Sequence, residues 1–119
     1  MNKNLVSKVA QIVFALTMLV FGFFHLSNAD AMKAMVPAFV PGGVLWVYVT
    51  GIALVLAALA FILNKKVKLA AYLLGVLLLM FVLTIHLPHL LDGDQNSMSM
   101  ILKDTGLAAA AFFIGSKNK

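Results

Sequence analysis

Four apolar stretches, separated by short polar segments, account for most of the 119 residues of the chain. Each is close to the roughly 20 residues that an α-helix needs to cross the hydrocarbon core of a bilayer. Because only a helix pairs all of its own backbone polar groups in hydrocarbon, the pattern predicts an all-α membrane protein, a bundle of four transmembrane helices. The predicted spans are residues 9–26, 44–63, 69–87 and 100–115, and the fourth is expected to begin at headgroup level around Ser97.

The composition agrees with this assignment. Hydrophobic residues make up 63% of the chain and charged residues 11%, with a mean hydropathy of +1.04, whereas soluble domains are about 25% charged. The loops between the spans are short, so residues 1–119 are expected to form a single membrane domain without an appended catalytic module. The net charge of +5 does not indicate nucleic acid, because membrane proteins collect lysines on one side. The lipid bilayer is the expected partner.

The distribution of lysines predicts the orientation. Four spans place the N-terminus, the loop between spans two and three, and the C-terminus on the same side, which then receives seven of the nine lysines. Lys33 and Lys103 fall on the other side. The positive-inside rule therefore predicts that both termini are cytoplasmic, in the inner membrane of a bacterium. The outer side receives all of the acids and histidines, namely Asp30, Asp92, Asp94, Asp104, His25, His86 and His89.

The first apolar stretch resembles a secretion signal, because lysines precede it and Ala29-Asp30-Ala31 follows it. It is longer than the 7 to 15 residues, roughly, of a signal core, so we expect a permanent span. The chain contains no cysteine, so it offers no thiol chemistry or iron–sulfur ligation, and any redox activity requires a bound cofactor or a partner.

The two outer loops carry strong local signals. Residues 29–35 are predicted to form a short helix at the membrane interface, preceded by the N-cap candidates Ser27 and Asn28. Pro41-Gly42-Gly43 is a turn signal that restarts the chain into span two. The second outer loop, residues 92–97, is polar and is expected to be the most mobile outer segment.

Small and polar residues recur at helical spacing in every span, which predicts the inward faces of a bundle. These faces are Lys8, Gln11, Ala15, Met18, Gly22 and His25 in span one; Trp46, Thr50, Ala53, Ala57 and Asn64 in span two; Tyr72, Gly75, Leu79, Val82, His86 and His89 in span three; and Asp104, Ala108, Ala111 and Gly115 in span four. Pro88 has no N–H for the carbonyl of Thr84, so span three should kink or end there, with the threonine hydroxyl easing the lost bond.

These faces bring ionisable residues together near the outer leaflet, with Asp104 directed inward towards the histidines and His86 as its favoured partner, which marks a candidate ligand-binding pocket. The candidates are His25, His86, His89, Asp104, Lys103, Trp46 and Thr50. Two simpler interpretations stay open. The histidines could bond only to water and loop carbonyls, and Asp104 could be an acid in the first turn of its helix, favoured there by the unpaired N–H groups.

No metal site is predicted. The weak candidates for copper are His25, His86, His89, Met98 and Met100, with Met32 and Met35 nearby, because thioether and imidazole together suit Cu(I). Methionine is equally an ordinary apolar filler. Haem and copper are both disfavoured as cofactors.

Several short motifs resemble those of DoxX-type membrane proteins, and together they cover nearly the whole chain. The motifs are residues 36–41, 46–51 and 65–71, then His86-Leu87-Pro88, and finally Leu102-Lys103-Asp104. The resemblance implies a four-helix membrane bundle. It also implies membership of a quinone-linked redox assembly or a membrane oxidative-stress assembly, with chaperones and cargo receptors among more distant relatives.

The favoured function is therefore an accessory membrane subunit of a quinone-linked redox assembly, with a polar pocket in the outer leaflet that binds a quinone or a similar amphiphile. The alternative is a non-enzymatic membrane protein that binds lipid or docks a partner through its helix faces and residues 37–41. A transporter is least favoured, because four spans leave little room for a pore. Autonomous catalysis is not expected, since no nucleophile, base and orienting group form a recognisable set.

Overall fold

The computed structural model describes residues 3–118 of the chain. Within these residues, four segments are long and apolar enough to cross a membrane: Asn4–Ser27, Val44–Leu63, Val67–Leu91 and Asn96–Ser116. The first is helix α1 (Lys3–Ser27), the second α3 (Val44–Leu63) and the fourth α6 (Asn96–Ser116). The third is built from α4 (Val67–Phe81), a π-helical turn η2 (Val82–His86) and α5 (Leu87–Leu91). The longest dimension, 46 Å, matches the roughly 40–45 Å of a bilayer with its headgroups.

All four predicted spans are confirmed as helices, with shifted ends. The first begins five residues before the predicted Val9, and the third continues past Pro88 to Leu91. The fourth begins at Asn96, next to the predicted start at Ser97. The sequence also correctly predicted the short helix after span one, which forms as α2 (Ala29–Met32) and a 3₁₀ turn, η1 (Lys33–Met35).

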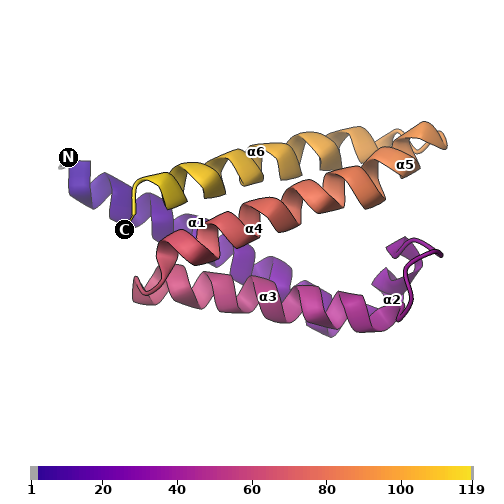
Figure 1. Ribbon diagram of the computed structural model, residues 1–119, viewed down its shortest axis with the longest axis horizontal. Coiled ribbons are helices and arrows are strands. Elements are labelled where there is room, and N and C mark those ends of the chain that lie inside the picture. Colours follow the sequence, from indigo (N-terminus) through magenta and orange to yellow (C-terminus); the bar gives the residue numbers. More distant parts are fainter. Residues whose placement is uncertain (1–2, 119) are drawn as a thin grey trace.

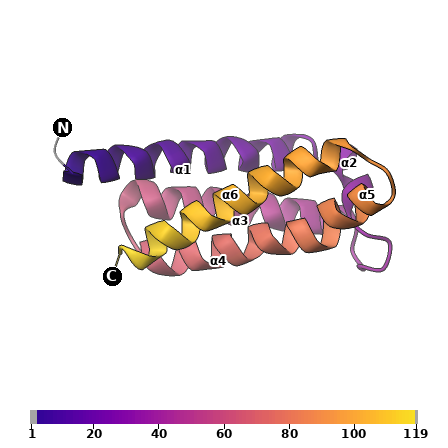
Figure 2. The same cartoon turned by 90° about the horizontal axis from the view of Figure 1, so that it is seen from above.

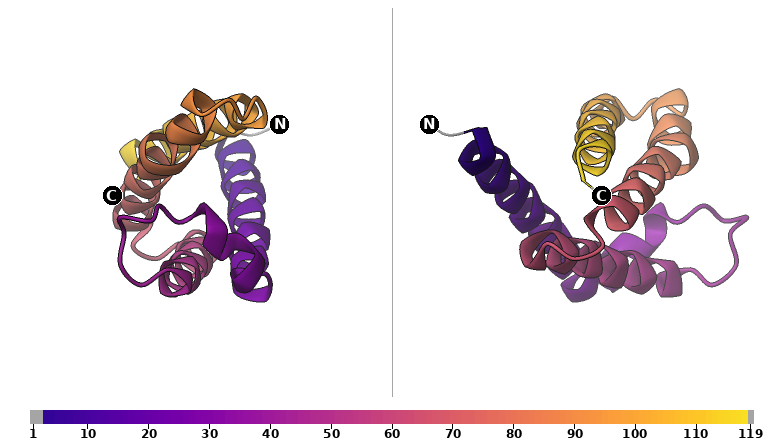
Figure 3. Two further views of the ribbon diagram at one scale, coloured as in Figure 1. Left: turned by 90° about the vertical axis from the view of Figure 1, so that its right-hand side faces the viewer. Right: turned by 60° about the vertical axis from the view of Figure 1, so that its left-hand side comes forward.

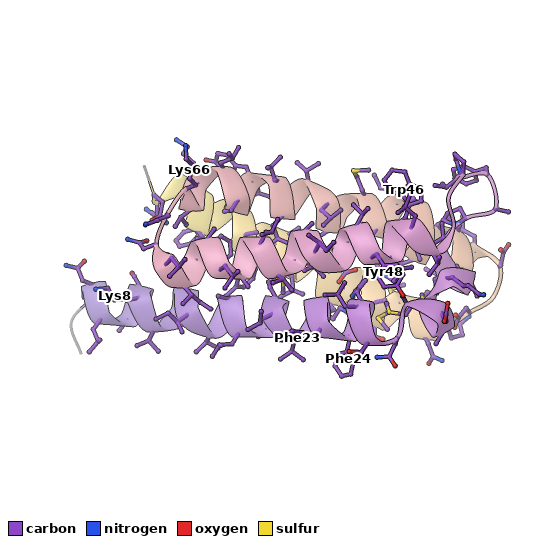
Figure 4. The ribbon with its side chains drawn as sticks, turned by 90° about the horizontal axis from the view of Figure 1, so that it is seen from below. Lys8, Phe23, Phe24, Trp46, Tyr48 and Lys66 are labelled. Carbon is purple, nitrogen blue, oxygen red and sulfur yellow. The ribbon has the colours of Figure 1, made fainter. Side chains whose placement is uncertain are left out.

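The four long helices pack as two pairs (Figure 1). α1 lies against α3, and α4 lies against α6, while α3 and α4 join the two pairs along a much looser seam. The pairs diverge, as the end-on views in Figure 3 show. Both termini lie at one end of the bundle together with the turn between α3 and α4 (Figure 2). We call this the lysine-rich end, because Lys8 and Lys66 mark it in Figure 4. The opposite end, which carries α2, α5 and the two connecting loops, is the histidine end.

Each helix pair is held close by two glycines, one from each helix. A Cβ added at Gly22 of α1 would lie 2.7 Å from Val55 of α3, and one at Gly51 of α3 would lie 2.9 Å from Leu26 of α1. The other pair repeats this arrangement. A Cβ at Gly75 of α4 would lie 2.7 Å from the Phe112 ring, and one at Gly115 of α6 would lie 2.6 Å from the Tyr72 ring. Close approach at small residues replaces the hydrophobic effect as the source of helix association in lipid.

The observed inward faces agree best with prediction in α1 and α6. Ala15, Met18 and Gly22 are buried in α1, and all four predicted residues of span four are buried in α6. The prediction for span two is wrong in part, since Trp46 is 44% exposed and Val47, Gly51, Leu54, Ala58 and Phe61 join Ala57 in the core. In span three Gly75 and His86 are buried as predicted, Leu79 is exposed, and the other buried residues are Val67, Ala71, Leu74 and Leu78. Alanines together with larger apolar residues such as Leu54, Phe61 and Leu74 fill the centre between the helices.

The two turns at opposite ends use unusual backbone conformations. Gly42 and Gly43 both have positive φ directly before α3 begins at Val44, which confirms the predicted turn. Asn64 and Lys66 form the tight turn between α3 and α4, and both are non-glycine residues with φ near +55° (56° and 55°). Asn64 is a tolerated left-handed residue and ends α3. Lys66 starts α4 from a conformation that costs a lysine about 1–2 kcal/mol.

Gly75→Ala is expected to lower the free energy of unfolding by about 1–3 kcal/mol, because the added methyl group must displace the packed Phe112 ring. Gly106→Ala is the matched control, because nothing lies within 4 Å of its Cβ position on α6. It should leave stability unchanged or raise it by up to about 1 kcal/mol. Denaturant titration of both variants in detergent micelles, followed by circular dichroism, measures the difference. Equal stability of the two variants would contradict the close approach of α4 and α6.

Candidate functional site

A cavity of about 560 Å³ occupies the space between the two helix pairs at the histidine end. Its walls come from α1, α3, α4, η2 and α6, and α2, η1 and the loop after them close part of it. Most of the lining is apolar, with Met18, Phe21, Leu54, Phe81 and Leu107 among the wall residues. The cavity exists because α1 and α3 turn away from α4 and α6 towards this end.

The polar part of the lining centres on a contact between span three and span four. His86 Nε2 donates a hydrogen bond to Asp104 Oδ2 at 2.9 Å. Both residues are buried, at 8% and 4% exposure. Burying a carboxylate away from water is costly unless it is paired and hydrogen-bonded. The pairing of His86 with Asp104 that the helix faces predicted is therefore present.

The π-helical turn positions His86 for this contact. Two α-helical turns are about 7.2 residues, so an unbroken α-helix would bring Ile85, rather than His86, beneath the buried Leu78. The turn η2 inserts one extra residue, as the hydrogen bond from the Leu87 N–H to the Val82 carbonyl shows. The inward face of the helix therefore passes through His86 instead of Ile85. Helix insertions of this kind are frequent at functional sites.

Pro88 explains why the turn lies here. It falls in the first turn of α5, where a missing N–H is tolerated, so of the two predicted outcomes, a kink or an end, the helix does not end at Pro88 but continues to Leu91 after an irregular turn. The Thr84 hydroxyl donates to the Met80 carbonyl at 2.7 Å, one turn back along its own helix. The helix accommodates the proline ring by widening the turn that directly precedes it.

Asp104 is the ninth residue of α6 and lies about 12 Å from the start of that helix, at 1.5 Å per residue. The interpretation as a first-turn acid is therefore wrong. Its Oδ1 lies 3.5 Å from Lys103 Nζ, which also sits 4.7 Å from the centre of the Phe21 ring on α1. Lys103 remains 41% exposed and lines the cavity. One carboxylate thus has a histidine and an ammonium as partners, and the ammonium connects α6 to α1 by a cation–π contact.

The other two histidines differ in position. His25 lines the cavity, and its Nδ1 donates to the Phe21 carbonyl at 2.7 Å, which leaves Nε2 as an acceptor in the neutral ring. His89 is not among the residues that line the cavity, and its Nδ1 donates to the Ile85 carbonyl at 2.6 Å. The simpler interpretation, bonding to water and loop carbonyls, does not describe these two contacts, because each carbonyl belongs to the same membrane-spanning segment as its histidine.

Trp46 and Thr50 also line the cavity, so six of the seven candidates lie around it. Trp46, labelled in Figure 4, lies at the start of α3. Its Nε1 donates to the Pro41 carbonyl, which ties the loop to α3. Met32, Met35, Val36, Pro37 and Val40 complete the lining from the loop side. The sequence had assigned these residues to a weak copper site or a docking loop, and it missed that they cover a cavity. Their common signal, apolar side chains concentrated in a loop, could have suggested that the loop covers an apolar surface.

Within residues 3–118, no three His, Cys, Asp or Glu side chains come together in a way that could hold a metal ion. His86 and Asp104 form a pair, and the third close partner, Lys103, is a cation. The chemistry available at the site is that of hydrogen bonding and charge: a carboxylate, an ammonium and one imidazole acceptor at the polar end of an apolar chamber.

A family model described as a domain of unknown function, DUF8561, matches residues 14–108, a range that covers most of the four helices and includes His25, His86, Lys103 and Asp104. No curated protein and no solved structure matches the chain.

Replacing His86 by Leu or Asp104 by Leu is expected to lower the free energy of unfolding by about 1–3 kcal/mol each, because each leaves a buried polar partner with fewer bonds. The double variant should lose less than the sum, with a coupling energy of about 0.5–3 kcal/mol. Denaturation of all four proteins in the same detergent completes the cycle. Strictly additive losses would show that the two side chains do not interact.

Proposed function

The chain belongs to the DUF8561 family of unknown function, and we propose that this integral membrane protein binds an amphiphilic ligand in the cavity between its two helix pairs. The observation that carries the proposal is the polarity of that cavity. Its walls are apolar, and its polar groups, His86, Asp104, Lys103 and His25, belong to the histidine end. A chamber with one polar end suits a molecule with a headgroup and an apolar body.

The size and depth of the cavity support the same conclusion. Its volume of about 560 Å³ falls within the roughly 300–1,000 Å³ of small-molecule sites. Counting back from the end of α5, His86 lies about 7.5 Å below the loop end of its helix. A ligand that reaches this pair has its polar group below the headgroups and its body in hydrocarbon. Such a molecule reaches the site from the bilayer rather than from water.

A quinone is the amphiphile that the resemblance to DoxX-type proteins favours. Lys103 carries N–H donors that a quinone carbonyl accepts, His86 holds the Asp104 carboxylate beside it, and the His25 Nε2 acceptor suits a quinol hydroxyl. In this proposal the protein is an accessory membrane subunit of a redox assembly and holds the quinone for a partner that supplies the electron transfer. The family assignment adds nothing to the choice of a quinone.

Partner docking is the second candidate function. The loop of residues 36–43 contributes to the cavity wall, and it also carries Phe39, which is 80% exposed. A large exposed aromatic on a loop that covers a ligand site is a contact point for a second membrane protein or for the headgroup layer. Ligand binding in the cavity would then alter the loop surface that contacts the partner.

We propose that the termini face the cytoplasm of a bacterium and that the cavity lies in the outer leaflet. The support is the lysine distribution, since Lys8, Lys65, Lys66, Lys68 and Lys117 all belong to the lysine-rich end. The amphiphile would therefore be drawn from the leaflet that faces away from the cytoplasm.

Protein extracted in mild detergent is expected to retain a quinone or lipid that mass spectrometry identifies. His86→Ala should lose most of this ligand, because the polar end of the cavity loses the side chain that pairs with the Asp104 carboxylate. His89→Ala is the matched control, since this residue is on the same segment and does not line the cavity. If His86→Ala fails to fold, Lys103→Ala, on the exposed rim of the cavity, tests the site instead. Retention of the ligand by both cavity variants would rule out this site.

The absence of cysteine makes the orientation testable. A single cysteine at Asp94, an exposed loop residue, should react with a membrane-impermeant maleimide in intact cells. A single cysteine at Lys65, exposed at the other end, should react only after permeabilisation. The reverse pattern of labelling would place the termini outside.

A further inference from the structure

A second hollow lies along the α3–α4 seam, towards the lysine-rich end. It is a groove of about 280 Å³. Small side chains create it: Ala57 on α3 and Ala70 on α4 leave space between larger neighbours such as Leu56 and Leu69. The groove shares only its deep end, at Ala53 and Leu77, with the cavity described above.

The depth of the groove is that of a single leaflet. Its lining on α4 runs from Lys66 to Leu77, a rise of about 16 Å over eleven residues. Half of a hydrocarbon core that is about 30 Å thick is a similar length. One lipid chain entering from the lysine-rich end would fill the groove to its inner limit.

The groove opens towards lipid rather than into the core. Leu56, Leu69 and Leu73 line it and are 60%, 58% and 61% exposed. Among residues 3–118, Lys66 is the one charged residue that borders the groove, and the rest of the lining is apolar. A ligand that fits this groove therefore has an apolar chain that lies along the seam. At the mouth of the groove it has a group that complements an ammonium.

The charge around the mouth identifies that group as an anion. Lys65, Lys66 and Lys68 lie within four residues, and all four acids of the chain belong to segments of the histidine end. Lys68 Nζ lies 5.9 Å from the centre of the Tyr72 ring and is not part of the groove lining. The general preference for lysines on one side accounts for all three residues. That preference does not explain why the Lys66 side chain borders an apolar groove.

We infer that this groove is a binding site for an anionic phospholipid, with one acyl chain between α3 and α4 and the phosphate on the Lys66 ammonium. The site is independent of the proposed amphiphile cavity, because it opens at the other end of the bundle and takes its lipid from the other leaflet. A bound lipid would also add contacts along the α3–α4 seam, which packs more loosely than either helix pair.

Binding of phosphatidylglycerol and phosphatidylcholine with identical acyl chains to the full-length protein in non-ionic detergent, followed by native mass spectrometry, tests the headgroup. The wild-type protein should bind phosphatidylglycerol more tightly. Lys66→Ala should weaken phosphatidylglycerol binding about fivefold, the change expected for one lysine at an anionic surface. It should leave phosphatidylcholine binding unchanged, and Lys66→Arg should keep the preference.

Lys68→Ala is the matched control, because it removes the same charge two residues away and outside the groove. It should keep most of the preference for phosphatidylglycerol. Equal binding of the two lipids by the wild-type protein, or an equal loss in Lys66→Ala and Lys68→Ala, would overturn the proposal in favour of unspecific attraction to the lysine-rich end.

The acyl chain is tested by filling the groove. Ala70→Leu should weaken the binding of both lipids, and Ala109→Leu, at an exposed position on α6, should not. Circular dichroism checks that both variants fold, and Ala70→Val is the milder replacement where the leucine disturbs the seam. A folded Ala70 variant that binds both lipids as tightly as the wild-type protein would exclude the groove as the site of the chain.

Discussion

Close approach of helices at glycine is the constraint on which the rest of the structure depends. Gly22 and Gly51 bring α1 and α3 together, and Gly75 and Gly115 do the same for α4 and α6. In lipid, association relies on van der Waals contact and on hydrogen bonds, because hydrocarbon solvates an exposed leucine as well as a protein interior does. Two tightly joined pairs result, and the space that the pairs leave between them becomes the cavity.

The cost of polar groups in hydrocarbon explains the chemistry of that space. Asp104 is tolerated well inside α6 because His86 and Lys103 surround it. His86 reaches it because Pro88 forces the preceding turn to widen, which rotates the histidine onto the inward face. Pro88, which removes one hydrogen bond from its own helix, thus determines the contact of His86 with Asp104 on α6. The same contact fixes the polar end of the candidate ligand site.

The looser α3–α4 seam has a different consequence. It carries the cavity at the histidine end and the groove at the lysine-rich end, and the two meet at Ala53 and Leu77. The proposed ligands enter from opposite leaflets, and each would add contacts where the protein itself supplies few. Ligands that bind the folded protein stabilise it by mass action, so the seam would be firmest when both sites are filled.

The sequence by itself determined the solvent, the four spans and the inward faces of α1 and α6, because these follow from local hydropathy and helical periodicity. It also indicated the pairing of His86 with Asp104, since few ionisable residues were available on facing helices. The inward face of span three could not be read in the same way, because the π-helical turn shifts the helical phase and a fixed period does not anticipate it. The inward face of span two was misjudged because Trp46 and Thr50 border a cavity and not a packed core. Which helices pair closely, and therefore where the cavity and the groove open, was decided only by the tertiary structure, because glycine contacts depend on what the opposite helix presents to them.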